Sequence, residues 1–128
     1  MAWGAAQNLL TSVSSPTAIP TGLSTNWLDC TVAPALNSGE SCLIQLQGTA
    51  GATASDLQFR ILSSNDGGTT YDNVPYISGS LGWVTASVSH VRTFSVYGLK
   101  QFKMQISVSA AVGWTACSAT YMLDGISA

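Results

Sequence analysis

The stretch QFKMQISVS, residues 101–109, alternates apolar and polar side chains without interruption. Phe102, Met104, Ile106 and Val108 fall on one side of an extended chain, and the polar residues between them fall on the other side. This period of two predicts a strand that is buried on one face and open on the other.

The same alternation continues outward along the chain, in Asp56–Ser63 and in Ser41–Gln47. Weaker strand patterns cover Asn26–Val32, Tyr71–Ile77, Trp83–Val88, Val91–Tyr97 and Trp114–Leu123. Turn sequences rich in Gly, Asn and Asp separate these segments, and no long stretch carries a helical stripe. The pattern predicts an all-β fold, an antiparallel β-sandwich of jelly-roll or immunoglobulin-like type with about seven or eight strands.

Residues 1–22 differ from the rest and predict an extended N-terminal arm in front of a β-sandwich domain at 23–128. Prolines in this segment remove backbone donors and disfavour a central strand. Its large apolar side chains cost about 1.5–3 kcal/mol each when left in water. We therefore expect the arm to pack on its own domain or on a neighbouring molecule rather than to fray. The candidate interface residues are Trp3, Leu9, Leu10 and Ile19, together with Trp83 as an aromatic at a solvent-exposed edge.

The composition of the chain combines a large apolar fraction with little charge. Hydrophobic residues make up 46% of it, which is enough for a core and argues against disorder. Charged residues make up only 8%, against about 25% in typical soluble domains. Because mixed surface charge keeps a free monomer soluble, this scarcity indicates that partners cover much of the surface. A monomer with a neutral, hydroxyl-rich surface remains the alternative.

The charge balance also excludes classes of partner. The formal net charge is −2, with four Lys and Arg in total, so we expect no binding to nucleic acid or to anionic membranes. No apolar run reaches the roughly 20 residues of a transmembrane helix. The first residues lack the features of a secretory signal, so we expect synthesis in a cytoplasm without export.

Chemistry-bearing residues are few. The chain has one histidine, His90, and no known catalytic or phosphate-binding motif, so we expect no enzymatic activity, no cofactor and no metal site. Cys30, Cys42 and Cys117 lie in apolar or alternating stretches and are interpreted as buried free thiols. A single disulfide between two of them, most plausibly Cys30 with Cys42 if their strands pair, stays open.

The segment SNDGGTTY, residues 64–71, resembles the Asp-box, a hairpin turn of sialidases and related propellers. Asp66 can accept backbone N–H groups across the turn, Gly67 and Gly68 permit a positive φ, and Tyr71 can pack beneath it. We interpret the segment as a structural turn. Weak calcium binding by Asp66 and Asp72 is the alternative.

The aromatic residues allow two interpretations. Rings exposed on a β-sandwich can stack on sugars, whereas buried or interfacial rings fill space and need one polar partner. We favour core or interface positions and keep glycan binding as an alternative. The rings concerned are Trp3, Trp27, Trp83, Trp114, Tyr76 and Tyr97.

Three segments resemble small β-sandwich virion proteins of tailed bacteriophages, of the type that decorates or cements capsids or sits on tails. They are residues 45–53, residues 57–76 and residues 94–106, and the likeness covers about residues 42–126. It implies a structural protein of the virion, made in the host cytoplasm, that binds the major capsid protein or another virion protein. It also implies a homo-oligomer, a trimer or a dimer. The arm lies outside the likeness, and no functional residue is carried over.

The sequence therefore predicts a non-enzymatic structural virion protein, a capsid decoration or cement protein that binds shell subunits and copies of itself. A receptor-binding or glycan-binding module on a phage tail or a cell surface is the alternative. Head or tail location, oligomeric state and host stay open at this point.

Overall fold

The computed structural model describes residues 4–13, 19, 26–37, 40–50, 57–82, 89–108 and 114–124. These residues contain eight strands and form two four-stranded sheets. The strands are β1 (Gln7–Val13), β2 (Leu28–Asp29), β3 (Ser41–Ala50), β4 (Leu57–Ser64), β5 (Ile77–Gly82), β6 (Ser89–Tyr97), β7 (Gln101–Val108) and β8 (Trp114–Asp124). Within these ranges there is no helix of the length and apolarity needed to cross a bilayer.

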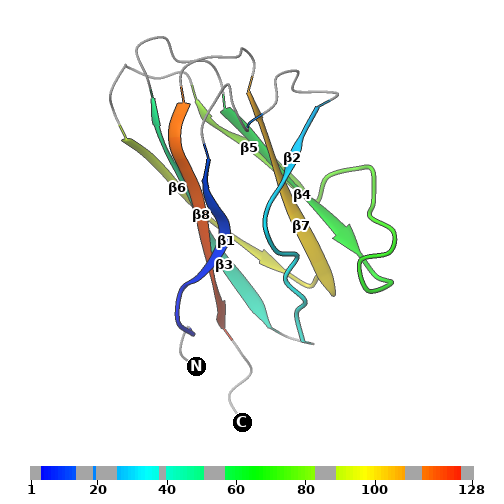
Figure 1. The fold of residues 1–128 in the computed structure, drawn as a ribbon. Helices are drawn as coiled ribbons and strands as arrows, with labels where there is room; N and C mark the ends of the chain where they lie inside the picture. The colour runs from blue at the N-terminus through cyan, green and yellow to red at the C-terminus, as the bar shows by residue number, and fades with distance from the viewer. Residues whose placement is uncertain are drawn as a thin grey trace.

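The two sheets form an antiparallel β-sandwich, as the alternation predicts. Sheet A has the order β1-β8-β3-β6, and sheet B has the order β2-β7-β4-β5. Every pair of neighbouring strands is antiparallel. Figure 1 shows the sheets as two layers that lie against each other.

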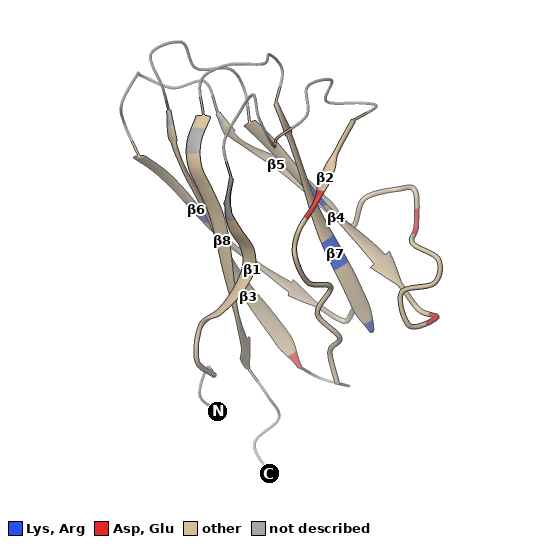
Figure 2. Ribbon diagram, in the orientation of Figure 1, with Lys and Arg blue, Asp and Glu red and all other residues tan. Residues whose placement is uncertain are grey.

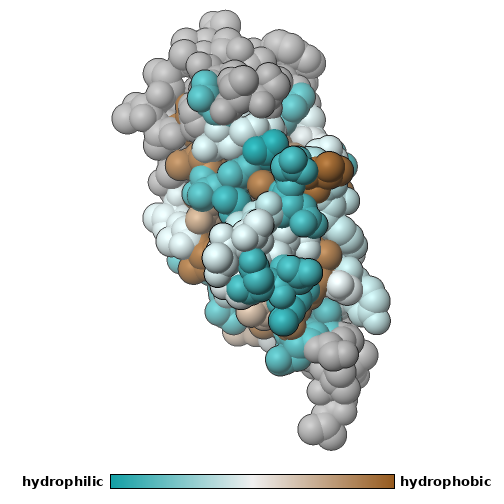
Figure 3. Space-filling model, turned by 90° about the vertical axis from the view of Figure 1, so that its right-hand side faces the viewer, coloured by the Kyte–Doolittle hydropathy of each residue, from teal (hydrophilic) through white to brown (hydrophobic). Residues whose placement is uncertain are grey.

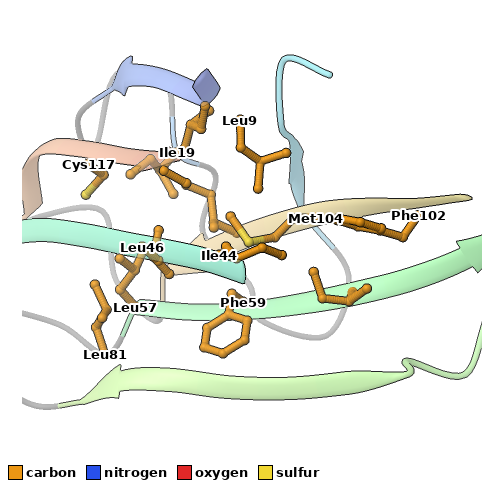
Figure 4. Close-up of a cluster of buried hydrophobic side chains, with 14 of the residues drawn as sticks. Leu9, Ile19, Ile44, Leu46, Leu57, Phe59, Leu81, Phe102, Met104 and Cys117 are labelled. Atoms are coloured by element: carbon orange, nitrogen blue, oxygen red, sulfur yellow. The ribbon is translucent and has the colours of Figure 1, made fainter. Parts of the chain in front are cut away.

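The core lies between the layers and takes one face of each strand. On β7, the four apolar residues of the 101–109 pattern are fully buried, and their β4 neighbours Leu57, Phe59 and Ile61 are fully buried as well. On sheet A, Ile44 and Leu46 of β3 face them, and Figure 4 shows these side chains meeting in one cluster. The alternation of apolar and polar residues thus determines which side chains form the core, because burial of each large apolar side chain stabilises the fold by about 1.5–3 kcal/mol.

The N-terminal segment differs from the expected arm. Gln7–Val13 forms β1 and pairs with β8, so these residues belong to the sandwich. Leu9 and Ile19 have no exposed surface, Leu10 is 4% exposed, and Figure 4 shows Leu9 and Ile19 in the core cluster. The sequence pattern did not predict this strand because its register shifts twice, which places the neighbours Leu9 and Leu10 both inside.

Two other expected strands change. The expected strand Tyr71–Ile77 is mostly a loop, and only Ile77 belongs to a strand. The loop is tied back to β4, where Asp72 N–H donates to the Ser63 carbonyl at 2.8 Å and Tyr76 N–H donates to the Ile61 carbonyl at 2.8 Å. The expected strand Asn26–Val32 shortens to Leu28–Asp29, while the expected strand Trp83–Val88 lies outside the described residues.

The cysteines are free thiols, as expected. Cys42 and Cys117 are buried and Cys30 is half-buried. The open alternative of a Cys30–Cys42 disulfide is wrong, because β2 and β3 belong to different sheets and do not pair.

Candidate functional site

The middle of the outer face of sheet A is a grid of uncharged side chains. Three rows cross β8, β3 and β6, and the strand register places their members side by side. The rows are Met122–Leu43–Ser95, Thr120–Gln45–Thr93 and Ser118–Gln47–Val91. Because the alternate residues of these strands point into the core, the nine side chains of the grid point away from it. We call this set the neutral face.

Most charged residues of the described part of the chain lie elsewhere, although the register places Asp124 one row beyond the grid, in line with Ser41 and Tyr97. Figure 2 shows most of the coloured charges on the side of β2, β7 and the loop after β4. Arg92 belongs to β6, but its side chain points across to sheet B. Its Nη1 donates to the Ser80 carbonyl at 3.0 Å, and its Cζ lies 5.3 Å from the centre of the Phe59 ring. The neutral face is therefore uncharged even though it borders an arginine.

The outer face of sheet B holds the opposite kind of surface, a network of charges and amides. Arg60 Nε donates to Gln105 Oε1 at 2.8 Å, and Gln105 Nε2 donates to Asp29 Oδ1 at 2.6 Å. Lys103 Nζ lies 3.6 Å from the same carboxylate oxygen. Figure 3, which looks at this side of the molecule, shows hydrophilic residues over most of its middle. This surface is organised by its own hydrogen bonds.

Cations cover the aromatic rings on this side. Arg60 Cζ lies 4.3 Å from the centre of the Trp27 ring, and Lys103 Nζ lies 4.6 Å from the centre of the Tyr71 ring. Burial lowers the pKa of Arg60 from its usual range, and nearby Asp29 opposes that shift. Because a sugar would have to displace a cation from each ring face, these two rings do not form an open stacking platform.

Exposed apolar side chains gather on the side of the sandwich where β6 ends sheet A. Val91 is 53% exposed and Tyr97 is 61% exposed, and both belong to β6. Tyr76, 46% exposed, donates its hydroxyl to the Tyr97 carbonyl at 3.2 Å. Val74, two residues before Tyr76, is 73% exposed. We call Val91, Thr93, Ser95 and Tyr97, on the side of β6 that has no neighbouring strand in the described structure, the β6 edge.

The Asp-box segment is a structural turn, as interpreted. Asp66 Oδ1 accepts from the Ser64 hydroxyl and from Thr70 N–H, both at 2.8 Å. The Thr70 N–H bond, with help from Ser64, holds the pKa of Asp66 below its usual range. Gly67 and Gly68 have positive φ of 76° and 88°. Among the described residues, no three His, Cys, Asp or Glu side chains are placed to hold a metal ion.

The remaining reactive side chains are those of His90, Cys42 and Cys117, and their contacts within the fold explain their positions. The His90 ring makes an edge-on contact with Trp114, with their centres 6.1 Å apart. Burial raises the pKa of Cys42 and of Cys117 to about 12, so both thiols stay protonated and are poor nucleophiles at neutral pH.

The interface residues expected from sequence fall into two groups. Leu9, Leu10 and Ile19 pack in the core of this chain, so burial within the domain explains their apolar character. Trp3 and Trp83 lie outside the described residues. Of the six aromatic candidates, Trp114 is fully buried.

Tyr76 and Tyr97 are the two large aromatic side chains that the described part of the chain exposes. Sequence reasoning named both tyrosines but not Val91 or the neutral face. Alternation marks outward residues, but it cannot show which strand lacks a neighbour.

Comparisons with known proteins identify no family: no protein-family model and no curated protein matches the sequence. Among solved structures, CBM4 is similar at 14% identity and a TM-score of 0.43, over 73% of this chain and 56% of that one. This chain therefore spans a little over half of that protein. Eiger TNF from S. frugiperda is similar at 9% identity and a TM-score of 0.47, over 100% of this chain and 96% of that one.

A third similar structure is the carbohydrate binding module CBM6cm-2 from Cellvibrio mixtus lichenase 5A in complex with cellotriose. It has 14% identity and a TM-score of 0.42, over 98% of this chain and 100% of that one. At these values the likeness concerns the fold alone, and the β-sandwich follows from the strand pairing of this chain itself.

Proposed function

We propose that this protein is a non-enzymatic assembly module, a capsid decoration or cement protein that binds shell subunits and copies of itself. The observation that carries the proposal is the neutral face, a broad set of uncharged side chains across β8, β3 and β6 in a chain whose charges lie mostly on the other side. The resemblance of residues 42–126 to small virion proteins of tailed phages supports the same function.

A partner can cover an uncharged face at little electrostatic cost. The cores of protein interfaces are depleted of charged residues, because each buried charge must be desolvated and paired. Gln45, Gln47, Thr93 and Thr120 can exchange water for hydrogen bonds to a partner, while Val91 contributes apolar contact. Sheet A can thus be covered by another protein without burying an ion.

Such a protein would act by mass action. A module that binds the assembled shell but not its free subunits stabilises the shell by RT ln(1 + [L]/Kd), which is about 2.7 kcal/mol at a free concentration of one hundred times Kd. No reaction and no cofactor is needed for this function.

Co-sedimentation with purified shells of the major capsid protein tests the proposal. A lysine at the centre of the grid, Gln45→Lys, should weaken binding about tenfold or more, because the new charge would be buried at the contact. Asn65→Lys is the matched control, because this exposed amide lies in the turn around Asp66, outside the neutral face. Equal binding by Gln45→Lys and the wild-type chain would overturn the assignment of this face, and no binding by the wild-type chain would overturn the function.

A second candidate, binding of a neutral glycan, is favoured by one observation. The exposed rings of Tyr76 and Tyr97 are joined by a hydrogen bond, and Tyr97 stands at the margin of the neutral face. Phenol rings beside amides and hydroxyls are the components of a sugar-binding surface. Titration calorimetry with neutral oligosaccharides tests it. Saturable binding that is lost in Tyr97→Ala would establish this function, and absence of heat across the series would exclude it for those sugars.

A further inference from the structure

We propose that two copies of this chain pair along β6, antiparallel and around a twofold axis, so that their two copies of sheet A become one continuous sheet. This pairing specifies how copies of the chain would bind each other in the proposed function, and its biological role rests on that function. It can still be measured on the isolated chain, so its failure is separate from a failure to bind shells.

The four edge strands of the sandwich are not equally open. The edge of β1 is occupied, because Thr31 N–H donates to the Leu9 carbonyl at 2.9 Å and Thr11 N–H donates to Thr31 Oγ1 at 3.4 Å. β2 has only two residues. On β5, the register shifts opposite Leu57 and the Ser80 carbonyl accepts from Arg92. Bulges, short strands and covering groups are the usual protections against pairing with another chain.

β6 has fewer of these protections, namely the inward-pointing Arg92 and the bond from the Tyr76 hydroxyl to the Tyr97 carbonyl. Its nine residues pair with β3 from Thr49↔Ser89 to Ser41↔Tyr97 without a shift in register. It contains neither lysine nor proline, and β5 does not pair with it in the described structure. Donors and acceptors of successive residues in a strand point to alternate sides, and the Tyr97 carbonyl accepts from the hydroxyl of Tyr76, a residue outside sheet A. The same alternation therefore directs the backbone groups of Val91, Thr93 and Ser95 to the open edge.

One register makes the edge complementary to itself. When the twofold axis passes beside Phe94, Val91 of each copy lies opposite Tyr97 of the other, and Thr93 lies opposite Ser95. The two most exposed apolar side chains of β6 then cover each other, and hydroxyls meet hydroxyls. Pairs of an aromatic and a β-branched residue are among the favourable cross-strand pairs.

Neighbouring registers are worse, and axes beside Thr93 or Ser95 would already separate Val91 from Tyr97. A shift of one residue along the partner strand would place the outward residues of one copy against the inward residues of the other. An axis beside Arg92 would place two guanidinium groups opposite each other, and it would draw both away from Ser80. The axis beside Phe94 avoids both penalties.

The lack of charge at the β6 edge favours a second copy of this chain as the partner that binds there. The edge and the neutral face beside it contain no ionised side chain to attract a basic or an acidic peptide. A self-pairing strand needs no opposite charge on its partner, because each residue type meets its complement by symmetry.

Light scattering on the eluting protein tests the register with two single variants, Val91→Glu and Tyr97→Lys. The wild-type chain should elute at twice the chain mass of 13.3 kDa. Each variant alone should raise the dimer dissociation constant about tenfold or more, since it places unpaired charges in the contact. An equimolar mixture should return to within about threefold of the wild-type constant, because one glutamate then meets one lysine while the second site keeps Tyr97 opposite Val91.

Two controls separate the register from a general effect of charge. Val32→Glu makes the same change at a valine that is 38% exposed on the β1 and β2 side, and it should leave the dimer unchanged. A mixture of Val91→Glu with Tyr97→Glu should remain monomeric, because two like charges meet. Circular dichroism confirms that each variant is folded. A wild-type monomer up to about 1 mM, a trimer, or an equimolar mixture that fails to recover would each overturn the proposal.

Discussion

Gly48 shows how closely the sandwich is packed at a single residue. A β-carbon at this position would lie 2.9 Å from Cε3 of Trp114 and 3.0 Å from Sγ of Cys117. The substitution Gly48→Ala should therefore lower the free energy of unfolding by about 1–3 kcal/mol, since the overpacking cost exceeds the backbone entropy that alanine recovers.

Chemical denaturation measures this change. Gln47→Ala, the adjacent exposed residue on the neutral face, is the control and should stay within about 0.5 kcal/mol of the wild-type chain. A Gly48→Ala protein as stable as the wild type would mean that Trp114 moves aside without cost.

The contribution of the turn after β4 to stability depends on pH, because it involves the carboxylate of Asp66. Its pKa is lowered, first by the bond from Thr70 N–H and then by Ser64, so the carboxylate stabilises the folded state only when it is ionised. This stabilisation is full above the unfolded pKa of about 3.9, and it is lost as the pH falls through the lower folded pKa. Asp66→Ala should therefore reduce the melting temperature at pH 7, and the difference from the wild-type chain should vanish in strong acid.

Thermal melts across a pH series measure this difference. Amide exchange at Thr70 should also be faster in the Asp66→Ala variant than in the wild-type chain. Asn65→Ala changes a neighbouring exposed residue without removing a carboxylate, so its effect should not depend on pH. A difference for Asp66→Ala that persists unchanged in acid would show that charge is not the cause.

At the scale of elements, the sequence predicts the strands whose apolar residues alternate, but it does not predict a strand whose pairing register is irregular. β7, β4 and β3 follow a period of two and appear where expected. β1 does not, because its irregular pairing buries Leu9 and Leu10 together. The expected strand at Tyr71–Ile77 fails for another reason, since bonds from Asp72 and Tyr76 to β4 hold that segment as a loop.

The candidate site was predictable only in part, for the same physical reason. Outward positions such as Gln45 and Gln47 can be read from local alternation. The open edge cannot, because it depends on which strands lie beside β6 after folding. Tyr76 and Tyr97 could be named as aromatic residues, but their exposure follows from long-range pairing.

β1 should therefore be needed for folding. An arm in front of a separate domain at 23–128 would be dispensable for folding, but Leu9 and Ile19 are fully buried in the core. Leu9→Ala should cost about 2–5 kcal/mol of unfolding free energy, and removal of 1–20 should abolish the cooperative transition.

Denaturant unfolding followed by near-ultraviolet circular dichroism checks both variants. Asn8→Ala, the exposed neighbour of Leu9 on the same strand, is the control and should unfold like the wild-type chain. A truncated chain that keeps a sharp transition would show that β1 adds no essential packing.

The whole molecule divides its surfaces by chemistry. Sheet A presents the neutral face and the β6 edge, whereas sheet B carries the Arg60, Asp29 and Lys103 network. The few charged residues are therefore distributed unevenly between the two sheets. Most of the charged residues belong to the outer face of sheet B and the turn after β4, and the neutral face of sheet A stays free for contacts that need no counter-charge.

This division leads to a prediction about salt. Exposed charges farther apart than the Debye length, about 8 Å at physiological ionic strength, barely interact, and shorter-range ion pairs weaken as salt rises. An association through the β6 edge and the neutral face contains no ion pair, so the dissociation constant of the wild-type dimer should change less than about threefold between roughly 0.05 and 0.5 M NaCl.

The mixed dimer of Val91→Glu and Tyr97→Lys is the internal reference, because it contains one engineered ion pair and should weaken steadily over the same range. Sedimentation equilibrium measures both constants under identical conditions. A wild-type dimer that loosens as steeply as the mixed dimer would mean that the contact uses the charged network of sheet B, and the sheet that binds copies would then be B rather than A.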